Sequence, residues 1–97
     1  MTIFALSSGS GIAGIAVIRV SGKNTADVIK GITGNILPSP RVATLTKFNK
    51  NGTKELIDEG VIIWFPAPNS YTGEDLAEFH VHGSRAVINA MHSSISK

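Results

Sequence analysis

The feature that constrains this chain most is the order in which two kinds of apolar pattern follow one another. Five short segments are rich in β-branched residues or alternate apolar with polar ones, as strands do. Two other segments place apolar residues three and four apart, as amphipathic helices do. The predicted strands cover residues 2–6, 15–20, 42–48, 55–65 and 74–82, and the predicted helices cover 24–32 and 84–96. This order predicts an α/β (α+β) two-layer sandwich, a mixed β-sheet with helices packed on it.

Local signals sharpen these boundaries. Asn24 and Ser84 stand where the two helices begin, and both residue types favour the N-cap. Asn51 and Gly52 predict a tight hairpin turn between two strands. Residues 61–65 are apolar on both faces, which predicts a central strand covered on both sides. The buried helix faces are predicted to be Thr25, Val28, Ile29 and Ile32 in the first helix, and Val87, Ile88, Met91 and Ile95 in the second.

Length and composition set the class of protein. With 97 residues the chain has room for one domain, and without cysteine it has no disulfides, thiol catalysis or cysteine-based metal centre. Only 16% of residues are charged, which points to a buried interface or to a piece of a larger protein. The last helix runs to Lys97 without a stop signal, so we expect the domain, residues 1–97, to be truncated at its C-terminal end.

Neither membrane insertion nor dedicated nucleic-acid binding is expected. No apolar run approaches the ~18 residues of a membrane span, and no signal peptide is evident, so we expect a cytoplasmic protein. Residues 1–54 carry seven Lys/Arg and one Asp, for a net charge of +6, whereas residues 55–83 carry six acids and no Lys or Arg. No basic run occurs, which argues against a dedicated nucleic-acid binder. We interpret the uneven charge as a sign that oppositely charged strands lie side by side.

A glycine-rich stretch at residues 9–14 matches G-x-G-x-x-G, the dinucleotide-binding pattern. That pattern requires a helix to follow, and an acidic residue about 20 positions further on. A predicted strand follows instead, so we interpret the stretch as a loop between strands. The chain has no G-x-x-x-x-G-K-[ST] motif, and therefore no P-loop of its own.

Four polar side chains on predicted strands are candidates for a site. Arg19 shares a strand face with apolar residues, so it either pairs with an acid of residues 55–78 or binds a ligand carboxylate. Glu78, His80 and His82 alternate along one strand and share its face. That face is a metal or acid–base site, a ligand- or partner-facing surface, or a solvated polar face. We predict no metal site, because no third or fourth ligand is evident and H-x-H on a strand is weak evidence for a metal.

A longer motif gives the chain a resemblance. Residues 69–75 read NSYTGED and continue as LAEFHVHG, preceded by DEG at 58–60 and FPAP at 65–68. Together with R-V-S-G at 19–22 and P-R at 40–41, this pattern resembles the N-terminal domain of the MnmE (TrmE) family of tRNA-modifying GTPases. The match runs in register over nearly the whole chain. It departs from the family in the glycine-rich loop and at His80 and Val81.

The resemblance implies a fold like the tetrahydrofolate-binding fold of the glycine-cleavage T-protein. It implies a domain that binds a one-carbon tetrahydrofolate, in the 5-formyl or methylene form, and that forms a homodimer. Arg19 and Glu78 match the family's folate contacts, and a further lysine contact is expected beyond residue 97. No catalytic residue is expected in this chain.

The resemblance also implies a larger protein around this domain. Its GTP, Mg²⁺ and K⁺ would be held on a separate GTPase domain, and its chemistry would involve an FAD-containing MnmG-type partner and the wobble uridine of tRNA. Two alternatives stay open: a purely structural dimerisation module, or a small standalone enzyme that uses Glu78, His80 and His82.

Overall fold

The computed structural model describes residues 3–6, 14–70 and 72–96. It contains five strands and two helices within these ranges, in the predicted order. The strands are β1 (Ile3–Leu6), β2 (Ile15–Ser21), β3 (Thr44–Asn49), β4 (Leu56–Phe65) and β5 (Leu76–His82), and the helices are α1 (Thr25–Thr33) and α2 (Arg85–Ile95). The glycine-rich stretch predicted as a loop lies outside the described residues, except for Gly14.

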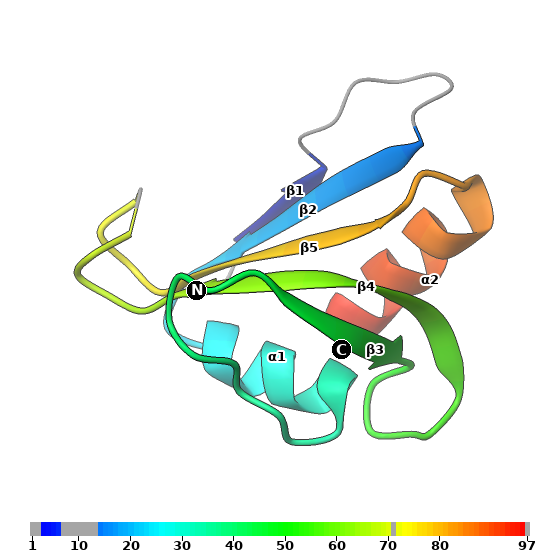
Figure 1. The fold of residues 1–97 in the computed structure, drawn as a ribbon, viewed down its shortest axis with the longest axis horizontal. Coiled ribbons are helices and arrows are strands. Elements are labelled where there is room, and N and C mark those ends of the chain that lie inside the picture. The colour runs from blue at the N-terminus through cyan, green and yellow to red at the C-terminus, as the bar shows by residue number, and fades with distance from the viewer. Residues whose placement is uncertain (1–2, 7–13, 71, 97) are drawn as a thin grey trace.

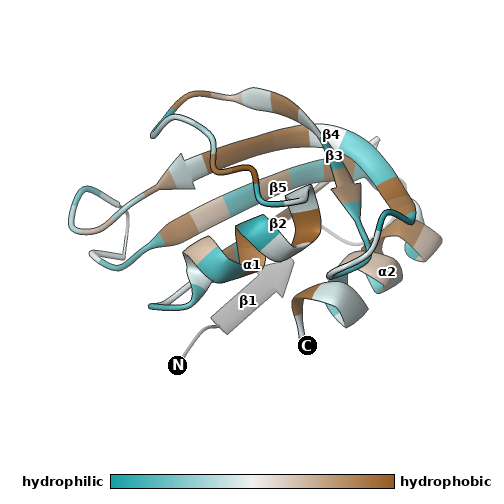
Figure 2. Ribbon diagram, turned by 90° about the horizontal axis from the view of Figure 1, so that it is seen from below, coloured by the Kyte–Doolittle hydropathy of each residue, from teal (hydrophilic) through white to brown (hydrophobic). Residues whose placement is uncertain are grey.

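The strands form one sheet in the order β1-β2-β5-β4-β3, and every pairing between these strands is antiparallel (Figure 1). The parallel component of the predicted mixed sheet is one isolated bridge, between Pro40 and Trp64. Both helices lie on the same face of the sheet, so the predicted two-layer sandwich is confirmed (Figures 1 and 2).

The core lies between the helices and one face of the sheet. Phe79 of β5 is fully buried at its centre, and its ring meets that of Phe48 edge-on, with centroids 5.4 Å apart and an interplanar angle of 77°. Such aromatic pairs contribute about 0.5–1.5 kcal/mol beyond the area they bury. Ile29, Ile32, Met91 and Ile95 complete the core from the helix side, as the helical spacing predicts.

The other face of the sheet is open, and here one expectation is wrong. Residues 61–65 of β4 alternate between half-buried and buried, because α1 and α2 cover only the face that carries Ile62 and Trp64. Val61, Ile63 and Phe65 point to the opposite face, where no described helix covers them. The apolar run at residues 61–65 predicted that β4 is covered on both faces, but within the described residues the helices cover only one of them.

The predicted helix signals hold in part. Ser84 caps α2 by accepting a hydrogen bond from the Val87 backbone N–H at 3.2 Å. Asn24 occupies the N-cap position of α1 but makes no capping hydrogen bond with its side chain. Gly34 ends α1 in the left-handed conformation, with φ 75°.

The β3–β4 hairpin forms as predicted and supports the charge expectation. Gly52 takes a positive φ of 73° in the turn, and Lys50 pairs with Glu55 across it at 3.0 Å. This ion pair joins the basic and acidic parts of the chain in the connection between β3 and β4. Among the described residues, neither helix has the length and apolarity that crossing a membrane requires.

Candidate functional site

A charged cluster forms where β2 and β5 pair on the open face. Arg19 and Glu78 are direct cross-strand partners, so the register alone brings them together. The Arg19 Nε donates to Oε2 of Glu78 at 2.9 Å, and Nε2 of His80 lies 3.1 Å from Oε1 of the same carboxylate. Glu78 is thus held by two basic side chains, one on each oxygen. Of the two alternatives for Arg19, the ion pair with an acid of residues 55–78 is present.

The carboxylate of Glu78 is kept in its charged form. Partial burial acts to raise its pKa, but the hydrogen bonds from His80 and Arg19 and their positive charge outweigh burial. The pKa of Glu78 therefore lies below its usual value, and the group accepts hydrogen bonds at neutral pH. Its side chain is only 16% exposed, whereas that of Arg19 is 51% exposed and free to reach a ligand.

An open pocket of about 500 Å³ adjoins this cluster. Such a volume lies within the range of small-molecule sites. The pocket has a charged wall and an apolar wall, which suits a flat heterocycle carrying hydrogen-bond donors. Its lining residues are Arg19, Phe65, Thr72, Leu76 and Glu78.

Residues 66–70 and 72–75, between β4 and β5, are held beside the pocket by hydrogen bonds. Asp75 Oδ1 accepts the Ala67 backbone N–H at 2.8 Å, and the Gly22 backbone N–H donates to the Asp75 carbonyl at 2.9 Å. The hydroxyls of Ser21 and Thr72 share a hydrogen bond of 3.0 Å, which links β2 to this segment. These contacts give Thr72 and Asp75 of the motif a structural role, because they hold one side of the pocket in place.

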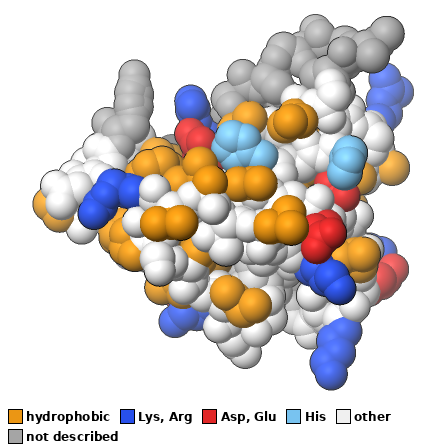
Figure 3. Space-filling model, in the orientation of Figure 1, with side chains coloured by type: hydrophobic (Ala, Val, Ile, Leu, Met, Phe, Trp, Pro, Cys, Tyr) orange, Lys and Arg blue, Asp and Glu red, His pale blue; other side chains and the backbone are white. Residues whose placement is uncertain are grey.

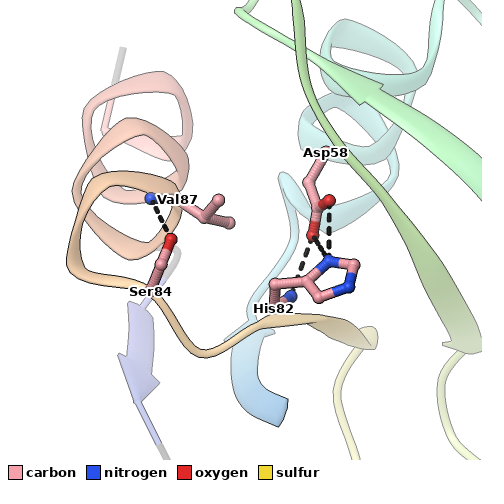
Figure 4. Close-up of polar contacts among 4 residues, drawn as sticks. All are labelled: Asp58, His82, Ser84 and Val87. Atoms are coloured by element: carbon pink, nitrogen blue, oxygen red, sulfur yellow. Dashed lines mark hydrogen bonds and ion pairs between the residues drawn. The ribbon is translucent and has the colours of Figure 1, made fainter. Parts of the chain in front are cut away.

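His82 does not join Glu78 and His80. Its ring Nδ1 lies 2.9 Å from both oxygens of Asp58, and its backbone N–H donates to Asp58 Oδ2 at 2.8 Å (Figure 4). The expected set of three side chains is therefore two separate pairs. Among the residues that the structure describes, no group of three His, Asp or Glu is placed to hold a metal ion.

The Asp58–His82 pair makes stability depend on pH. Burial acts to raise the pKa of Asp58, but hydrogen bonds from His82 and from the Glu59 backbone outweigh it, so this pKa is lowered. A lowered folded-state pKa stabilises the protein above the unfolded value of about 3.9, and the stabilisation is lost as pH falls through the folded value. We expect the free energy of unfolding of Asp58→Asn to fall less steeply at acid pH than that of the unmodified chain. Urea unfolding at a series of pH values measures this difference.

Asp27→Asn is the control for that measurement, because Asp27 is exposed on α1. An Asp58→Asn variant whose stability falls with acid as steeply as that of the unmodified chain would contradict the role assigned to the pair.

Sequence reasoning named two residues of this candidate site and missed others that surround it. Arg19 and Glu78 were both predicted, and the structure brings them together. Phe65 and Leu76 were missed as pocket walls, because the sequence gives no sign of which apolar strand ends remain uncovered. Asp58 was also missed as the partner of His82, since 24 positions separate the two.

These features define a class: a two-layer α+β domain with a ligand-sized, charge-lined pocket on its open sheet face. The family described as GTP-binding protein TrmE N-terminus matches residues 2–97, and the chain belongs to this family.

Curated relatives agree with this assignment. The chain is 68% identical over 97 residues to the tRNA modification GTPase MnmE of Pelagibacter ubique, covering all of this chain and 22% of that protein. It is 50% identical over 90 residues to the mitochondrial 5-taurinomethyluridine-[tRNA] synthase subunit GTPB3 of Danio rerio, covering 93% of this chain and 18% of that protein. The chain thus spans about a fifth of the length of these relatives.

Proposed function

We propose that this domain binds a one-carbon tetrahydrofolate in the pocket beside Arg19 and Glu78. The observation that carries the proposal is the Glu78 carboxylate, held ionised at a pocket of about 500 Å³. A pterin ring presents adjacent N–H donors, and a carboxylate accepts such donors as a pair. The resemblance to the folate-binding family supports the same two residues.

The other walls of the pocket suit the remaining parts of this ligand. Phe65 and Leu76 offer apolar surface to a flat ring, and Thr72 adds a hydroxyl. Arg19 keeps part of its guanidinium for the ligand, since only Nε bonds to Glu78. That guanidinium presents the fork that binds carboxylates or carbonyls, and folate carries both.

We also propose that the domain forms a homodimer through exposed apolar surface. Leu45 is 69% exposed and pairs across β3 and β4 with half-buried Val61, and Val42, just before β3, is 52% exposed. Hydrophobic side chains are visible over the face shown in Figure 3, beside a group of a basic, an acidic and a histidine side chain. Sedimentation at micromolar concentration should give a dimer, and a clean monomer would count against the dimer.

For the larger protein we propose a GTPase that modifies the wobble uridine of tRNA in the cytoplasm with an FAD-containing MnmG-type partner. The names of the relatives support tRNA modification and GTP hydrolysis. This chain contributes ligand binding and assembly, while GTP, Mg²⁺ and K⁺ belong to a GTPase domain elsewhere. No residue here is assigned a catalytic role.

Calorimetry with 5-formyl-tetrahydrofolate tests the ligand proposal. We expect saturable binding of one folate per chain, and no heat of binding with GTP. A chain that sediments as a dimer but gives no folate binding would instead be a structural dimerisation module.

A further inference from the structure

We propose that His80 is a positioning residue for Glu78, holding one carboxylate oxygen so that the remaining lone pairs face the pocket. We further propose that the protonation state of His80 sets how strongly the Glu78 carboxylate binds the N–H donors of a ligand. This inference rests on the proposed ligand site and adds to it a residue that departs from the family pattern. It concerns orientation and pH response, because His80 itself does not line the pocket.

The geometry gives His80 a defined role. An ionised carboxylate only accepts hydrogen bonds, so the His80 Nε2, 3.1 Å from Oε1, must carry the proton. A carboxylate offers about four lone-pair positions. His80 occupies one on Oε1 and Arg19 one on Oε2, which leaves one on each oxygen. Two adjacent N–H donors of a ring fit that arrangement.

The backbone holds His80 in place. Its cross-strand neighbours are Val17 on β2 and Val61 on β4, so apolar side chains flank the imidazole on both sides. Gly60 lets β4 approach closely, because a Cβ there would collide with the His80 carbonyl oxygen. The imidazole is 29% exposed, which leaves it room to exchange a proton with solvent.

The charges around His80 determine the sign of the pH effect. On β5, Glu78 and His82 lie two residues to either side of His80. Arg19, on β2, bonds to the other oxygen of Glu78. On β4, Glu59 lines a hollow together with His80 and His82. With His80 neutral, Arg19 and Glu78 balance each other. With His80 protonated, its charge-assisted bond to Oε1 strengthens and competes with the donors of a ligand. Binding should therefore weaken as His80 takes up a proton.

The first test needs no ligand. Carbon-13 NMR of the Glu78 carboxyl, followed against pH, reports whether His80 holds the group. In His80→Leu the titration midpoint of Glu78 should move upward, because a hydrogen bond and a charge are lost. In His80→Gln, whose amide donates without titrating, the shift should be smaller. Identical midpoints in the unmodified chain and His80→Leu would overturn the positioning role.

The second test measures binding of 5-formyl-tetrahydrofolate by calorimetry at about pH 7.5 and about pH 5.5, the range in which histidine titrates. The readout is the Kd of the unmodified chain divided by that of His80→Gln, so that effects of pH on the ligand cancel. We expect a ratio near one at the higher pH, rising at least about threefold at the lower pH. A ratio that does not change with pH would overturn the pH response.

The two tests separate this inference from the proposed function. If the unmodified chain binds no folate at either pH, the ligand proposal fails, whereas the Glu78 titration still confirms or overturns the role of His80. If folate binds but neither His80 variant alters the Glu78 midpoint or the Kd ratio, the ligand proposal stands and the inference about His80 fails.

Discussion

Replacing Glu78 with glutamine is expected to weaken the binding of 5-formyl-tetrahydrofolate about 100-fold, or about 2.8 kcal/mol. Glutamine keeps the size and shape of the side chain but removes its charge. Each ligand N–H that donates to the carboxylate then loses a charge-assisted bond and gains a weaker neutral one. The amide must also present N–H groups to Arg19 or His80, which are themselves donors. Calorimetry on the two proteins measures the difference.

The matched control is Glu55→Gln. Glu55 also forms an ion pair with a basic side chain, but on the β3–β4 hairpin, and it is 66% exposed. We expect this variant to bind folate as the unmodified chain does. If Glu78→Gln remains folded and binds folate within about threefold of the unmodified chain, the carboxylate does not hold the ligand.

Truncating Phe79 to alanine is expected to cost about 3–5 kcal/mol of folding free energy. Phe79 is fully buried, contacts Phe48 edge-on, and lies on β5 between β2 and β4. Its removal leaves a cavity that the surrounding strands cannot close, since they are paired on both sides. The total free energy of unfolding of a domain of this size is about 5–15 kcal/mol, so the variant should be close to unfolding.

Urea unfolding followed by the fluorescence of Trp64 measures this loss, because Trp64 is the chain's one tryptophan and belongs to the core. Leu56→Ala is the control, since Leu56 is 56% exposed and is not among the residues of the proposed dimer surface, so its truncation should change folding free energy by less than about 0.5 kcal/mol. A loss below about 1 kcal/mol in Phe79→Ala would mean that the core is not centred on β5.

The order and type of every element followed from local signals. Alternating and β-branched residues marked the strands, and Ser84 marked the start of α2, because these preferences act within a few residues. The burial of β4 was overestimated, since the sequence shows that residues 61–65 are apolar but not how many layers cover them. Which face stays open is a property of where both helices pack.

The site divides in the same way. Arg19 emerged because it is an unusual charge on an otherwise apolar strand, Glu78 emerged because it alternates with two histidines along one strand face, and the family motif names both. The sequence did not indicate that His80 and His82 would bond to different carboxylates. His80 and His82 share a strand face by spacing, yet His82 bonds to Asp58, because partners on neighbouring strands depend on register. Spacing along one strand shows which side chains share a face, but their partners on the next strand depend on how the strands are aligned in the sheet.

The most direct test of the central claim is where on the domain the ligand binds. In a titration of the nitrogen-15-labelled chain with 5-formyl-tetrahydrofolate, we expect the amide shifts of Arg19, Phe65, Thr72 and Glu78 to move together and saturate at one folate per chain. The amides of Asn51, Asn89 and Ser94, which line the hollows by the helices, should remain unchanged. Shifts confined to those hollows, or none, would contradict the assignment of the pocket on the open sheet face.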